Sequence, residues 1–328
     1  MQMFSDFTVL VVLYSIILGL GAFAGIFSER AGIINIGIEG IMSMGALGYA
    51  IGGGILHKIS PGNLTSGWLQ FVLFGFAIAF GILFSCLHGF ATIKLKSDHT
   101  ISGVALNILA LGVAVVLLNP SLLGDNNKQI PLDVKELVLD LGDRSKTYGF
   151  ETIISLKLFI FIGLAILAYV LLNKTSWGLR FKAVGENPQA VDVAGLNVYK
   201  FKWQGIILTG VFAGVAGGIF AQNLQGAFTG TTLGLGFLAL AVMIMGHWNI
   251  GYVVLCAIGF SLFQTIGTFA VGSGFRTLTI NLFKKDLDVY GPLFQTIPYI
   301  FTIVALVAFS KLSPGPAAAG INYDKSKR

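Results

Sequence analysis

The sequence predicts an all-α fold: a polytopic membrane helix bundle of about nine transmembrane helices, within a range of about 8–10. Three observations support this. The chain is 55% hydrophobic and only 11% charged, with a mean hydropathy of +0.82. Soluble domains carry roughly 25% charged residues, so this chain cannot cover itself with a water-soluble surface. Its apolar residues also come in blocks of about 20, the helix length that spans a bilayer core.

Nine apolar blocks give the expected crossings. In chain order they are Phe7–Phe27, Ala31–Leu56, Trp68–Phe90, Ile101–Leu118, Ile153–Leu172, Gly205–Leu224, Phe237–Met245, Gly251–Val271 and Gly291–Phe309. Phe237–Met245 is too short to span alone, so we expect a half-helix or re-entrant segment that is buried in protein. Asn119–Thr152 is the longest polar segment, and no motif marks its role. We expect residues 1–312 to form the transmembrane domain and residues 313–328 to form a disordered cytoplasmic tail.

The loop charges predict an orientation. If the loop Lys174–Trp203 is cytoplasmic, the inside segments hold twelve Lys and Arg residues and the outside segments hold eight. Short loops rich in Lys and Arg stay on the cytoplasmic side. The N-terminus is therefore expected outside the cell and the C-terminus inside. The net charge of +6 comes mostly from these loops, so it indicates membrane topology rather than nucleic-acid binding.

The same basic loop carries the start and stop signals of a short helix. Asn187 suits the N-cap, Pro188 suits the first helical position and Gly195 suits the position after the last turn. The residues between, Gln189–Ala194, are compatible with about two helical turns. The loop therefore predicts a rigid surface helix. The alternative is a connector that carries these capping residues without a further role.

Small residues in the block Gly205–Leu224 predict close helix packing. Gly210, Gly214 and Gly218 recur every four residues on one face, and Ala213, Gly217 and Ala221 line the adjacent face. Membrane helices associate where small residues let backbones approach closely. The partner helices lie either within this subunit or in a second subunit.

Polar residues inside apolar blocks are candidates for a translocation pathway. Glu39 is the only acid deep in such a block, and Asn35 precedes it by one helical turn. A structural hydrogen bond or salt bridge that fixes a broken helix is the alternative role for Glu39. The other pathway candidates are Asn107, Gln222, Asn223 and Gln264, and interhelical hydrogen bonding is their alternative role.

Enzyme chemistry finds no support in the sequence. The four His residues lack metal-ligand spacing, no nucleophile lies near a base, and no phosphate-binding loop is present. Cys86 and Cys256 lie inside apolar blocks and are expected to be small core residues. We therefore expect no catalytic residue, no metal and no cofactor.

Four motifs together resemble a known family. They are Glu29–Gly40 (ERAGIINIGIEG), Ile101–Asn107 (ISGVALN), Gly178–Arg180 with Ala183–Pro188 and Ala194–Gly195, and Pro298–Tyr299. The set resembles permease subunits of ABC importers of the ribose and branched-chain amino acid type, particularly the nucleoside and simple-sugar branch. The resemblance extends from about Gly25 to Phe309. The segment Asn119–Thr152 matches no motif of the family.

The resemblance implies a function and a set of partners. It makes the short helix a cytoplasmic coupling helix, which docks on an ATP-binding subunit that drives alternating access. The ATPase-coupling candidates are Arg180, Gly185, Glu186, Asn187, Pro188, Ala194 and Gly195. It also implies a second permease subunit, expected to be a different chain, and an extracytoplasmic substrate-binding protein. Nucleosides or simple sugars would cross the plasma membrane.

Two other classes of protein remain as alternatives at this point. A secondary transporter of a small polar solute would also use broken helices with polar residues near the midplane. It usually carries an internal repeat, and none is found here. A membrane-embedded enzyme would need convergent His, Asp or Glu side chains, whereas Glu39 is the only acid in the predicted spans.

Overall fold

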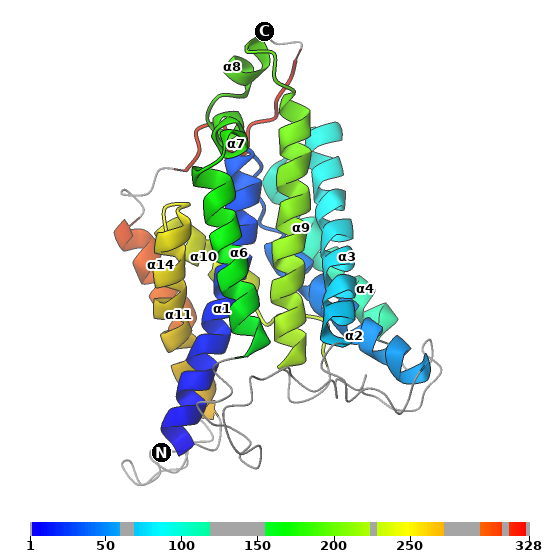
Figure 1. Ribbon diagram of the computed structural model, residues 1–328, viewed down its shortest axis with the longest axis vertical. Helices are drawn as coiled ribbons and strands as arrows, with labels where there is room; N and C mark the ends of the chain where they lie inside the picture. Colours follow the sequence, from blue (N-terminus) through cyan, green and yellow to red (C-terminus); the bar gives the residue numbers. More distant parts are fainter. Residues whose placement is uncertain are drawn as a thin grey trace.

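The computed structural model describes residues 2–59, 69–118, 155–223, 228–271, 296–309 and 315–325. Within these ranges the elements are all helices (Figure 1), as the sequence predicts. Six of them are long and apolar enough to cross a membrane by length and composition: Asp6–Arg30, Leu69–Lys94, His99–Leu117, Leu156–Asn173, Val198–Gln222 and Ile250–Thr268. The number of about nine crossings stays a prediction. The long polar segment 119–152 lies outside the described residues.

The helices form one elongated bundle. The longer helices are α1 (Gln2–Arg30), α2 (Ile38–Ile59), α3 (Leu69–Gly89), α4 (His99–Leu117), α6 (Leu156–Asn173), α9 (Val198–Gln222) and α11 (Ile250–Val271). The shorter ones are the π-helical turn η1 (Phe90–Lys94), α7 (Ser176–Glu186), α8 (Pro188–Val193), α10 (Leu235–Met245) and α14 (Ile297–Phe309). In Figure 1 the N-terminus lies at one end of the bundle, and α8 lies with the C-terminus at the other. We call the latter the α8 end.

The small residues of α9 pack inside this subunit. A Cβ atom on Gly214 would lie 2.6 Å from the carbonyl oxygen of Ala77 in α3, and one on Gly210 would lie 2.8 Å from that of Gly81. The neighbouring face of α9 meets α2, where Gly217 contacts the backbone of Met42. The prediction of close packing is confirmed. Its partners are helices of the same chain.

Aromatic side chains join α1 to its neighbours in the buried core. Phe27 of α1 stacks on Phe212 of α9 with ring centroids 5.0 Å apart, and Phe23 stacks on Phe161 of α6 at 5.9 Å. Offset-stacked pairs of this kind contribute about 0.5–1.5 kcal/mol beyond the burial of their area. Phe23, Phe27 and Phe212 are almost completely buried. Aromatic contacts therefore join helix α1 to both α6 and α9.

The block that the sequence predicts as the second span is not helical over its first residues. Helix α1 ends at Arg30 and α2 begins only at Ile38, so residues 31–37 are not helical. Gly32 takes a φ of +78°, in the left-handed region that favours glycine. We call residues 31–37 the interruption. Its backbone groups lie outside any helix and need other hydrogen-bond partners, and three of the candidate pathway residues, Asn35, Glu39 and Asn107, lie around it.

Candidate functional site

The short helix predicted in the basic loop is present as α8. The side chain of Asn187 accepts a hydrogen bond from the backbone N–H of Ala190 at 3.0 Å, and Pro188 occupies the first turn. Gly195 follows the helix with a φ of +81°. Helix α8 ends at Val193, one residue before the expected end. The capping residues therefore act as the sequence predicts, whereas a docking role for this helix stays a prediction.

A second helix, α7, lies directly before α8, and sequence reasoning missed it. Thr175 is its N-cap, and its hydroxyl accepts a hydrogen bond from the N–H of Gly178 at 3.0 Å. Gly178 lies against the end of α6, because a Cβ there would be 2.6 Å from the carbonyl oxygen of Leu172. The signal that could have found α7 is Thr175 itself, a good N-cap residue. Asn187 both ends α7 and begins α8.

The coupling candidates divide into an exposed group and a buried group. Arg180, Glu186, Asn187, Ala194 and Gly195 are exposed, whereas Gly185 and Pro188 are buried. Two apolar side chains share the exposed surface: Leu179 is 71% exposed and Val193 is 79% exposed. The surface of the α7–α8 pair therefore combines charge with apolar contact area. Such a mixture is typical of protein–protein interfaces.

The α7–α8 pair is anchored to the end of α1. Glu186 lies 3.4 Å from the guanidinium of Arg30, a half-exposed ion pair. Gly185 packs against the carbonyl oxygen of Arg30, so the two backbones are in contact. Desolvation, together with the nearby charge of Arg30, lowers the pKa of Lys182 on the same helix. The last turn of α7 is thus in contact with Arg30, the last residue before the interruption.

Glu39 lies in the first turn of α2 and is 6% exposed. Its carboxylate accepts three hydrogen bonds: from the Thr231 hydroxyl at 3.0 Å, from the Gly234 N–H at 3.1 Å and from the Gly236 N–H at 2.7 Å. Gly234 and Gly236 lie at the start of α10. The carboxylate therefore satisfies backbone donors at the N-terminus of α10 that otherwise have no partner within the helix. This geometry supports the structural role among the two considered.

The Asn107 side chain of α4 bridges the end of the interruption and the first turn of α2. Its side-chain oxygen accepts from the N–H of Gly40 at 2.8 Å, and its amide donates to the carbonyl of Ile36 at 3.1 Å. Asn35 is completely buried, and neither polar atom of its side chain has a hydrogen-bond partner among the described residues. The structure thus brings Asn35, Glu39 and Asn107 together around one interruption.

Of the other pathway candidates, Gln222 and Asn223 lie at the C-terminal end of α9, whereas Gln264 lies in α11. The side-chain oxygen of Asn223 accepts from the ammonium of Lys157 at 2.5 Å, and its amide donates to the carbonyl of Ile219 at 2.6 Å. The Gln222 amide has no partner among the described residues. Lys157 is 6% exposed and was missed. Its signal was plain, because it is the only charged residue between Ile153 and Leu172.

The loop before α10 carries further residues that sequence reasoning missed. Leu233 has a φ of +56°, which is unusual for a residue other than glycine, and its side chain is 60% exposed. The Tyr299 hydroxyl of α14 donates to the carbonyl of Leu233 at 2.9 Å. Strained, exposed residues of this kind concentrate at functional sites. Tyr299 was found only within the Pro298–Tyr299 motif.

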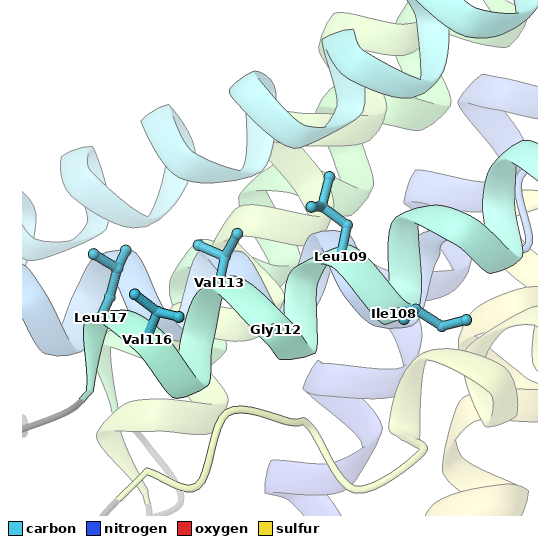
Figure 2. A pocket seen from close by; sticks show the side chains of 6 residues that line it. All are labelled: Ile108, Leu109, Gly112, Val113, Val116 and Leu117. Atoms are coloured by element: carbon cyan, nitrogen blue, oxygen red, sulfur yellow. The ribbon is translucent and has the colours of Figure 1, made fainter.

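A shallow hollow of about 530 Å³ lies on the outer face of α4 (Figure 2). Its lining comes from this one helix: Ile108, Leu109, Gly112, Val113, Val116 and Leu117. No lining side chain can donate or accept a hydrogen bond. A polar solute that crosses a membrane needs such groups along its path. The hollow is therefore an apolar outer surface rather than a recognition site for a polar solute.

Comparisons with known proteins identify the family. The family described as "Branched-chain amino acid transport system / permease component" matches residues 7–308. The nucleoside ABC transporter permease protein NupC of Lactococcus lactis is 38% identical over 96% of both chains. The guanosine ABC transporter permease protein NupQ of Bacillus subtilis is 35% identical over 97% of this chain and 96% of its own. No solved structure matches the chain at a significant level.

A third relative, from Haloferax volcanii, is named a putative glucose ABC transporter permease protein, TsgC13. It is 30% identical over 88% of this chain and 87% of its own. The apolar helices agree with a multi-pass protein of the plasma membrane, and permeases of this family are not enzymes. The family implies ATP-binding and substrate-binding partners. The chain belongs to the permease components of branched-chain amino acid type transport systems, and it is the membrane-spanning permease subunit of an ABC importer.

Proposed function

We propose that this subunit forms part of a pathway that carries nucleosides into the cell. The observation that carries the proposal is the similarity to two relatives that are named for nucleoside and guanosine transport, at 38% and 35% identity over almost the whole chain. Transport would be driven by ATP hydrolysis in a partner subunit and would proceed by alternating access. The tightly capped interruption around Glu39 fits a helix that changes shape at membrane depth.

Simple sugars are the second candidate substrate. The 30% identity to the putative glucose permease of Haloferax volcanii supports it. The experiment that separates the two substrates is uptake of radiolabelled guanosine, uridine and glucose into proteoliposomes that hold the purified transporter and enclose ATP. We expect guanosine or uridine to accumulate and glucose not to. Accumulation of glucose alone would contradict the proposal.

We infer that the second permease subunit is a different chain. Two permeases that share a substrate name occur in each of two organisms: NupB with NupC, and NupP with NupQ. This chain is 38% identical to NupC but 22% identical to NupB, and 35% identical to NupQ but 27% identical to NupP. It therefore resembles one member of each pair. A heterodimer with a second, more distant permease follows from this pattern.

The α7–α8 pair is the proposed docking site for the ATP-binding subunit, on the cytoplasmic side. Its exposed residues Leu179, Arg180 and Val193 offer apolar area and a charge to a partner. The excess of Lys and Arg in the inside segments supports this orientation. The contact of Gly185 with Arg30 gives the pair a direct link to the interruption. Movement of the ATP-binding subunits would then reach Glu39 and Asn107.

A further inference from the structure

The C-terminal segment 315–325 lies at the α8 end (Figure 1), where it contacts α7. The N–H of Ala317 donates to the carboxylate of Glu186 at 3.2 Å, and the N–H of Ala318 donates to the carbonyl of Gly185 at 2.8 Å. The sequence predicts a disordered tail from residue 313. The structure instead places residues 315–325 against the helix pair, and we call these residues the C-terminal strap.

The same strap contacts the interruption between α1 and α2. The N–H of Gly320 reaches the carbonyl of Gly32 at 3.4 Å. Gly320 has a φ of +80°, and a Cβ there would lie 2.8 Å from the side chain of Ile34. The strap is built from Pro316, three successive alanines and Gly320. Small side chains let its backbone come within hydrogen-bonding distance of two other backbones.

A third set of contacts ties the strap to the junction between η1 and α4. The side-chain amide of Asn322 donates to the carbonyl of Lys96 at 2.8 Å, and its oxygen lies 3.1 Å from Nε2 of His99. Asp324 pairs with the ammonium of Lys96 at 2.9 Å. The hydrogen bond from the Lys96 ammonium to the Asp324 carboxylate raises the pKa of Lys96. Asn322 therefore links the end of the chain to the first residue of α4.

His99 connects the strap back to the interruption. The backbone N–H of Ile34 donates to Nδ1 of His99 at 3.2 Å, so Nδ1 carries no proton and Nε2 carries one. Nε2 then donates to the Asn322 oxygen. His88 of α3 lies 3.2 Å from the carbonyl of the same Ile34. Ile34 is thus held by two histidines, and one of them is held by the strap.

We propose that the C-terminal strap transmits movement of the α7–α8 pair to the interruption and to the start of α4. The inference rests on the proposed docking of an ATP-binding subunit at α7–α8. Along its length the strap first contacts Glu186 of α7, then Gly32 and Ile34 of the interruption. Its last contacts are with His99 and Lys96. A chain of specific hydrogen bonds between elements that move separately is a physical route for coupling between distant sites. The strap is then a second route, beside the direct contact of Gly185 with Arg30.

The test compares two truncations in the complete transporter, reconstituted with its partner subunits and supplied with guanosine. A chain that ends at residue 314 lacks the strap. The matched control ends at residue 325 and loses only Ser326, Lys327 and Arg328. The measured quantity is the ratio of guanosine-stimulated to basal ATP hydrolysis. We expect it to fall about tenfold in the shorter chain and to stay unchanged in the control, within the range of allosteric coupling.

A pair of point variants gives the same comparison without truncation. Asn322→Ala removes the contacts with His99 and Lys96, whereas Ile321→Ser changes a neighbouring side chain that is 60% exposed. We expect Asn322→Ala to lower the ratio about fivefold and Ile321→Ser to leave it unchanged. If the shorter chain fails to insert, this pair decides the question.

The outcomes distinguish a failure of the strap proposal from a failure of the proposed function. If the full-length transporter takes up neither guanosine nor uridine, the proposed function is wrong. If it takes up guanosine and the strap variants keep the full ratio, the strap is passive packing and the inference is overturned. Copurification of the ATP-binding subunit is measured in every variant. A loss of copurification in Asn322→Ala would make the strap part of the docking surface and would likewise overturn its role as a transmitter.

Discussion

The carboxylate of Glu39 accepts the backbone N–H of Gly236 at 2.7 Å, so an acid from the first turn of α2 caps the start of α10. The two helices thus share one negative charge at their N-termini. Helix N-termini carry a partial positive charge, and a carboxylate beside them is stabilising. The contact explains how an ionisable side chain with only 6% exposure can lie between apolar helices.

Replacement of Glu39 should destabilise the protein in proportion to the acceptors that are lost. Glu39→Ala removes all three acceptor contacts and leaves the Gly234 and Gly236 N–H groups unsatisfied, at about 1–3 kcal/mol for each buried group. Glu39→Gln keeps one oxygen and should fall between alanine and wild type. Thermal denaturation in detergent measures the order. A fully stable Glu39→Ala protein would show that the contacts do not matter.

Gly236→Ala should be far more damaging than a glycine substitution in an open part of the bundle. A Cβ on Gly236 would lie 2.6 Å from the backbone nitrogen of Glu39, whereas one on Gly259 of α11 would meet nothing within 4 Å. We expect Gly236→Ala to lower the yield of folded protein several-fold. Gly259→Ala should be neutral or stabilise by about 0.4–1 kcal/mol, because alanine restricts the unfolded chain. Size-exclusion profiles of the two variants, purified in parallel, test the difference.

Asn107→Asp should impair transport although the change is nearly isosteric. The aspartate can still accept the hydrogen bond from Gly40, but it presents a second oxygen to the carbonyl of Ile36, where the amide now donates. Two acceptors at about 3 Å repel each other and leave the Ile36 carbonyl unsatisfied. Guanosine uptake normalised to the amount of inserted protein is the measurement. Uptake equal to wild type would mean that the interruption tolerates loss of this bridge.

Charge reversal at Arg180 should uncouple the transporter without preventing insertion. Arg180 is exposed on α7, within the proposed docking surface. An opposite charge there would face the partner subunit, and like-charge juxtaposition at an interface costs several kcal/mol. Arg180→Glu is expected to abolish substrate-stimulated ATP hydrolysis. Lys174→Glu changes an exposed cation of the same loop outside α7 and serves as control. Full transport by Arg180→Glu would show that the α7–α8 pair is only a connector and has no docking role.

A cysteine at position 189 should report the orientation of the chain. Gln189 is exposed on α8, whereas the native Cys86 and Cys256 are only partly exposed and are first replaced by alanine. We expect Gln189→Cys in whole cells to resist a membrane-impermeant maleimide and to react once the membrane is opened. Labelling of intact cells would place α8 outside and reverse the topology.

Local signals in the sequence account for much of the fold. Asn187, Pro188 and Gly195 predict α8 because caps act over a few residues. The short apolar block Phe237–Met245 predicts a half-helix or re-entrant segment, and the structure has the short helix α10 at Leu235–Met245. Helix α7 was missed because its composition is mixed. The segment was interpreted as part of a basic loop, and the N-cap signal of Thr175 was not used.

The partners of the candidate site could not be predicted in the same way. Glu39 binds Thr231 and Gly236, which lie 192 and 197 residues away along the chain. No spacing rule reaches that far, so the acid was found but its role was left open. The strap was expected to be disordered because the tail is rich in Pro and Ala and then basic. The same small residues are those that permit backbone contact with α7 and the interruption.

The shared cap at Asn187 has a mechanical consequence. One residue ends α7 and begins α8, so the two short helices meet at a pivot without a flexible linker. The far end of α7 is pressed against the last turn of α6 through Gly178. A force on α8 would therefore reach one end of α7, whose other end lies against the last turn of α6. Displacement of α8 would then shift α7 relative to α6, because only Asn187 joins the two short helices.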